Sequence, residues 1–71
     1  MFPKEYVNFG KITWTNCSVS VYSDNFHSKN LNAIPTNVER AYWQGDNIHV
    51  ELKDGWHWIY EDFSGFKHRW K

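Results

Sequence analysis

The sequence has few residues that could cross-link the chain or hold it in a membrane. It contains one cysteine among 71 residues, which excludes an internal disulfide framework and any zinc or iron–sulfur site built from several cysteines. No apolar stretch approaches the ~20 residues that cross a bilayer, and residues 1–5 lack the apolar run of a secretory signal. We therefore expect a reducing, cytoplasmic setting.

The sequence also has no excess of charge of either sign. Eight Lys and Arg residues balance eight Asp and Glu residues, which argues against a general phosphate-binding surface and against attraction to a membrane. Only four glycines are present, and none belongs to a phosphate-binding loop. Because chains divide into several cores only at greater length, we expect one domain over residues 1–71.

Aliphatic side chains are scarce, whereas aromatic ones are plentiful. The chain has two leucines but five Phe, four Tyr and five Trp. A single core seldom stabilises so short a chain by a wide margin. Large rings, which bury ~150–250 Å² each, are therefore expected to supplement the core.

The first half of the chain gives mixed signals. Residues 11–22 are typical of extended structure, but the apolar phase changes after Trp14, which indicates a bulge or a tight turn near Thr15 and Asn16. Residues 23–36 resemble a long connection. Residues 38–44 alternate as a strand does, although Thr36 and Glu39 form a capping-box pattern, so a short helix in the 23–44 region stays an alternative.

The second half carries clearer strand and turn signals. Residues 48–53 and 56–61 alternate, and Asp54-Gly55 between them is a strong hairpin signal. Turns at 45–47 and 63–66 complete a meander whose last strand spans residues 66–70. The sequence predicts a mainly β fold, a small antiparallel sheet of five or six strands, curled or barrel-like.

A two-residue loop at Asp54-Gly55 would determine the two faces of this hairpin. One face, the expected core, would carry Ile48, Val50, Leu52 and Ile59. The other would carry Trp56, Trp58, Tyr60, His49, Glu51 and Lys53. A four-residue turn over 44–47 would add Tyr42 and Arg40 to the second face, with Arg40 opposite Glu51.

Rings among ionisable side chains are typical of an interaction surface. We therefore expect a non-catalytic module, an accessory or inhibitory protein, that binds another protein through this aromatic face. Self-association into a homo-oligomer through an edge strand is a related option. The rings could instead be covered by the N-terminal segment or by the 23–36 connection, or serve only as cross-strand stabilisers.

Two other kinds of binding are alternatives. The C-terminal residues Lys67, Arg69, Trp70 and Lys71 could hold a single-stranded nucleic acid by charge and stacking. Against this, residues 38–65 carry six acids and two bases. A third option is a small ligand or carbohydrate stacked on Trp56 or Trp58.

The sequence does not favour catalysis, a cofactor or a metal site. Cys17 is in phase with Val19 and Val21, so we expect a buried thiol and not a nucleophile. On the two-residue loop His49 and His57 lie on opposite faces, which disfavours a histidine metal site.

Overall fold

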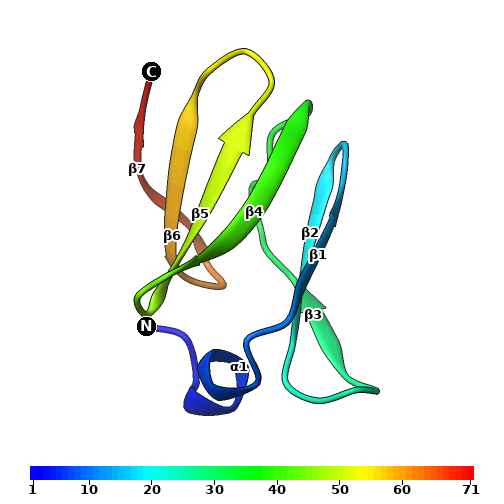
Figure 1. Cartoon of the computed structure of the whole chain (residues 1–71). Coiled ribbons are helices and arrows are strands. Elements are labelled where there is room, and N and C mark those ends of the chain that lie inside the picture. The colour runs from blue at the N-terminus through cyan, green and yellow to red at the C-terminus, as the bar shows by residue number, and fades with distance from the viewer.

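A short helix precedes seven strands in the computed structural model, which describes all 71 residues. In chain order the elements are α1 (Lys4–Phe9), β1 (Ile12–Thr15), β2 (Ser18–Tyr22), β3 (Ser28–Asn30), β4 (Val38–Gln44), β5 (Asn47–Leu52), β6 (His57–Asp62) and β7 (Gly65–Trp70). They form two antiparallel sheets, sheet A in the order β1-β2-β3 and sheet B in the order β4-β5-β6-β7 (Figure 1). The predicted mainly β fold is confirmed, with two sheets in place of one.

Sheet A contains the predicted change of phase. Thr15 pairs with Ser18, so a tight turn of Asn16 and Cys17 separates β1 from β2. This turn leaves Cys17 exposed, and the expectation of a buried thiol is wrong because the residue belongs to the turn and not to the strand. The 23–36 connection is a loop apart from the three residues of β3.

The only helix lies where the sequence analysis did not place one. Pro3, with φ of −57°, precedes α1, and Gly10, with φ of +73°, ends it by donating its N–H to the Tyr6 carbonyl at 2.9 Å. Proline before a first turn and glycine after a last one are ordinary helix boundaries. The 23–44 region holds no helix. Residues 38–44 form strand β4, as their alternation predicted, and not the alternative short helix. No helix of the chain is long and apolar enough to cross a membrane.

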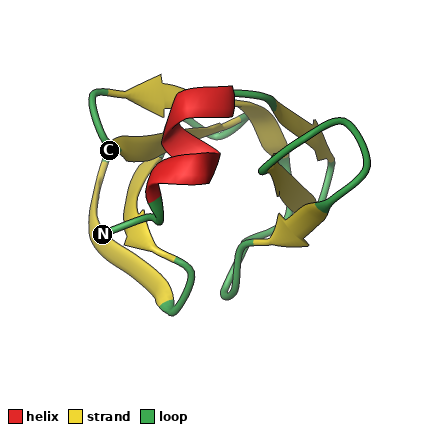
Figure 2. Ribbon diagram, turned by 90° about the horizontal axis from the view of Figure 1, so that it is seen from below, coloured by secondary structure: helices red, strands yellow, loops and turns green.

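The two sheets curve around one core. Its buried members are Phe2, Val19, Val21, Leu31, Val38, Ala41, Ile48, Val50, Leu52 and Tyr60. The sheets meet where the Val38 N–H donates to the Asn16 carbonyl at 2.9 Å. Seen from below, the strands follow an arc, and α1 lies in front of them (Figure 2). The domain is curled, with β7 and β3 as free edges.

Candidate functional site

The turn between β5 and β6 determines which side chains face outward. The Leu52 N–H donates to the Trp56 carbonyl at 2.9 Å, and the Gly55 N–H donates to the Leu52 carbonyl at 3.0 Å. The loop therefore holds three residues, Lys53, Asp54 and Gly55. Gly55 has a φ of +94°, as a three-residue hairpin with a glycine bulge requires. The predicted two-residue loop is wrong.

The additional loop residue exchanges the two faces of β6. Val50 pairs with Trp58, and Glu51 pairs with His57. Because directly opposed residues share a face, Trp58 lies on the core side and His57 lies on the outer side. Ile59, expected on the core face, pairs with His49 on the outer side, where it is still buried at 8% exposed.

The predicted docking face of Trp56, Trp58 and Tyr60 consequently does not form. Tyr60 is 0% exposed, and its hydroxyl donates to the Ala33 carbonyl at 2.7 Å. Trp56 and Trp58 are half-buried and pack against the core. All three rings lie on the inner side of sheet B, the side that α1 and sheet A cover.

A different line of rings crosses the outer side of sheet B, one from each strand. We call Tyr42, His49, His57 and Trp70 the outer row. Successive ring centroids are 5.0, 5.1 and 5.2 Å apart, and His57 stacks on Trp70 with 12° between their planes. These neighbours leave His49 only 7% exposed, although no second layer covers this side.

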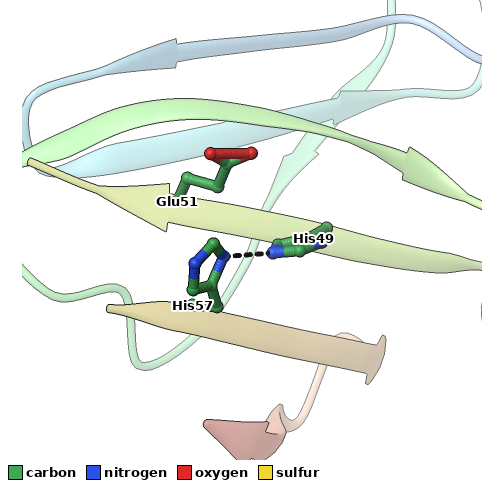
Figure 3. Close-up of side chains that lie close together, drawn as sticks. All are labelled: His49, Glu51 and His57. Atoms are coloured by element: carbon green, nitrogen blue, oxygen red, sulfur yellow. Dashed lines mark hydrogen bonds between the residues drawn. The ribbon is translucent and has the colours of Figure 1, made fainter. Parts of the chain in front are cut away.

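Hydrogen bonds orient the rings of the outer row. The Tyr42 hydroxyl donates to Glu51 at 2.9 Å, so its oxygen is free to accept from His49 Nδ1 at 3.1 Å. Gln44 Oε1, an acceptor, also lies 3.2 Å from this nitrogen. These partners assign the proton of His49 to Nδ1. His49 Nε2 then accepts from His57 Nδ1 at 2.9 Å (Figure 3).

An ion pair borders this network. Arg40 lies opposite Glu51, as predicted, and donates from Nε to Oε2 at 2.9 Å and from Nη2 to Oε1 at 3.2 Å. The Arg40 hydrogen bond holds the pKa of Glu51 below its ordinary value, and the Tyr42 bond adds to this. Burial lowers the pKa of His49, and the neighbouring His57 lowers it further. The lowered pKa keeps His49 uncharged at neutral pH, and the lowered pKa of Glu51 keeps the neighbouring carboxyl group ionised.

β7 forms a second surface, at the free edge of sheet B. Trp70 is 45% exposed and Phe66 is 37% exposed. The Arg69 guanidinium lies over the rings of Trp58 and Phe66, 5.3 Å from each centroid. Beside it is an open groove of about 320 Å³, which we call the β7 groove, lined by Pro35, Thr36, Asn37, Leu52, Asp54, Trp56, Trp58 and Arg69.

The structure thus places the predicted site residues in separate parts of sheet B. It brings Arg40, Tyr42, His49 and Glu51 together on the outer side, as expected for the second face. Lys53 lies in the turn instead, where its Nζ donates to Asn16 Oδ1 at 3.4 Å. The C-terminal residues Lys67, Arg69, Trp70 and Lys71 are all exposed on or just after β7.

His57 is the site residue that the sequence analysis missed. The expectation that His57 and His49 lie on different faces of the sheet is wrong, because the loop has three residues. One signal could have found it: only that loop places Trp58 and Tyr60 on the same face as Val50 and Ile48. Matching apolar positions across a hairpin is what determines its register.

Comparison with protein-family models, with curated proteins and with solved structures finds no match to this chain.

Proposed function

We propose that this protein is a non-catalytic binding module that takes up an extended, acidic segment of another protein along the free edge of β7. The observation that carries the proposal is the placement of β7. It is the last strand of sheet B and pairs only with β6, and five of its six residues are exposed. An edge strand presents a row of unpaired N–H and C=O groups, to which a further strand can add.

The pairing of β7 favours docking at its C-terminal half. Trp70, Arg69 and His68 pair in regular register with β6, whereas the register shifts between His68 and Phe66. A bulge interrupts the hydrogen-bonding row. An added strand would therefore align with residues 68–70.

Charge selects the occupant of this edge. Residues 65–71 contain three cations, Lys67, Arg69 and Lys71, and no acid, while the rest of the chain carries five cations and eight acids. A second copy of the chain would bring like charges together across the pair, which is unfavourable. A partner strand with Asp or Glu at alternate positions would bring opposite charges together.

Aromatic side chains are available on both sides of the docked segment. On the outer side, Trp70 backed by His57 offers a flat apolar surface. On the inner side, the β7 groove offers Trp58 and the Arg69 guanidinium. Trp, Tyr and Arg are the residues that most often dominate binding energy at protein interfaces, and strand addition draws its specificity from such alternating contacts.

The proposal is tested by selecting binders from a displayed library of random peptides. We expect the selected peptides to share acidic residues at alternate positions. They should lose affinity for a Lys67→Glu/Lys71→Glu variant but keep it for the matched Lys4→Glu/Lys53→Glu variant, which changes the net charge equally. Neutral or basic selected sequences, or equal losses in both variants, would refute the proposal.

A second candidate function is single-stranded nucleic-acid binding by the same strand. It is favoured by the exposed Trp70 ring, 45% accessible, next to three cations, since bases stack on such rings. Titration with a labelled single-stranded oligonucleotide separates the two functions. Binding that weakens steeply with salt, together with no peptide selection, would favour the nucleic acid.

A further inference from the structure

Three groups that ligate metals meet on the outer side of sheet B. One ligand atom from each of His49, Glu51 and His57 lies within 4.8 Å of the others. They come from β5 and β6 and lie next to each other across the hairpin (Figure 3). We infer that these three residues form a binding site for a divalent transition-metal ion of the zinc type. This inference does not depend on the proposed docking at β7.

His49 is already oriented as a ligand. Its Nδ1–H donates to Tyr42 and lies near Gln44, which directs the lone pair of Nε2 toward His57. Metal-bound histidines almost always donate their second ring N–H to an oxygen in this way, which fixes the tautomer and raises ligand basicity. Because His49 is 7% exposed, its ring has little freedom to lose when an ion binds.

His57 requires one change of tautomer. Its Nδ1 donates to His49 Nε2 over 2.9 Å, so an ion between the two nitrogens takes the place of that proton. The proton leaves Nδ1 for water and Nε2 takes one up, which keeps the ring neutral. With Zn–N bonds of about 2.0–2.1 Å, tetrahedral ligands lie about 3.3 Å apart, so the two nitrogens must separate by about 0.4 Å and the rings must turn until both lone pairs point at the ion.

Glu51 supplies the third ligand. Its Oε2 accepts hydrogen bonds from both Arg40 and Tyr42, whereas Oε1 accepts one, from Arg40, at 3.2 Å. Oε1 therefore has the greater spare capacity as a donor to a metal. The side chain of Glu51 is 18% exposed and that of Arg40 is 59% exposed, so Arg40 can move toward solvent without breaking the core.

The donor set selects the kind of ion. Two imidazole nitrogens and one carboxylate oxygen suit zinc and its neighbours, while calcium and magnesium prefer oxygen ligands alone. Three protein ligands leave a fourth position of a tetrahedral ion for solvent or for a group from a partner. Trp70, which stacks on His57, is exposed beside the three ligands.

Calorimetric titration of the tag-free protein with zinc chloride tests the inference. We expect one ion per chain for the natural protein, and affinity reduced by about 100-fold or more in a His57→Gln variant, beyond the usual effect of losing an outer partner of a ligand. His57 is half-buried, and circular dichroism will confirm that the variant folds. The matched control is His68→Gln, since His68 is an exposed histidine on the same side of sheet B that is not in the cluster.

Long-range ¹H–¹⁵N correlation of the ring nitrogens gives a second readout. Zinc should convert His57 from the Nδ1–H to the Nε2–H tautomer and leave the tautomer of His49 unchanged. No saturable binding, equal binding by the His57→Gln variant, equal loss in the His68→Gln variant, or an unchanged His57 tautomer would each overturn the site and leave the imidazoles as a cross-strand pair.

Discussion

Replacing Tyr60 with Phe removes a single oxygen atom from the inner side of sheet B. Tyr60 is 0% exposed, and its hydroxyl donates to the Ala33 carbonyl over 2.7 Å. Deleting the donor leaves that part-buried carbonyl without this partner, which costs about 1 kcal/mol or more of folding free energy. In a domain of about 60–100 residues, each kcal/mol shifts Tm by roughly 4–8 °C. We therefore expect Tm to fall by at least about 4 °C.

The same hydroxyl makes stability depend on pH in the alkaline range. Burial raises the pKa of Tyr60 well above its ordinary value. Above about pH 10 the unfolded chain releases this proton while the folded protein keeps it. Stability therefore falls as the pH rises, by up to about 1.4 kcal/mol per pH unit from this group alone. Phe has no such proton, so the Tyr60→Phe variant should lose this part of the alkaline dependence.

Urea unfolding followed by tryptophan fluorescence, at neutral pH and above pH 10, measures both effects. Tyr22→Phe is the matched control, because the Tyr22 hydroxyl only accepts a 3.4 Å bond from Thr13 at the surface, and its loss should change stability by no more than about 0.5 kcal/mol. If Tyr60→Phe matches the natural protein in both stability and alkaline slope, the hydroxyl is not buried and the described register of β6 is refuted.

Further expectations follow from individual positions. Ala33 has a φ of +58°, so Ala33→Gly should stabilise the protein by about 0.5–1 kcal/mol in urea unfolding; destabilisation would contradict this. Gly55→Ala, at φ of +94°, should cost about 1–2 kcal/mol in the same assay, and an unchanged midpoint would count against the bulge. The Ser64 hydroxyl is the main cause of the lowered pKa of Asp62, so Ser64→Ala should raise that pKa in a carboxyl-¹³C NMR titration, where an unmoved curve would disagree. Exposed Cys17 should be alkylated by iodoacetamide without denaturant, and protection until unfolding would show otherwise.

Much of the fold was predictable because its turns are marked in the sequence. Gly45 and Asp46 end β4, and Gly45 has the φ of +64° that such a hairpin turn uses. The pairing of Arg40 with Glu51 follows from that turn and is confirmed. The residues of a turn were sufficient to predict the strand pairing wherever they fitted only one turn type.

The β5–β6 turn was not predictable from its own residues. Asp54-Gly55 is compatible with a two-residue loop and with a three-residue loop that ends in a glycine bulge. Tertiary packing decides between them, because only the longer loop buries Tyr60 with Ile48. The turn residues alone favour the two-residue loop, which places His49 and His57 on opposite faces, so the histidine cluster has no signal in the turn itself.

Helix α1 was missed for a different reason. Its six residues have no apolar periodicity strong enough to predict a helix, and none of them is fully buried. The helix is stabilised by its boundaries and by Phe2 just before it, which is 2% exposed and packs edge-on against Phe63 with ring centroids 5.0 Å apart. Such long-range contact between the chain start and the β6–β7 turn has no local signature.

The length of the 53–55 loop gives this hairpin a parity rule for insertions and deletions. Because side chains alternate along a strand, adding or removing one residue would turn Trp58 and Tyr60 outward and His57 inward on β6. Adding or removing two would leave every side chain on its present side. Natural or engineered variants of this turn should therefore tolerate even changes of length far better than odd ones.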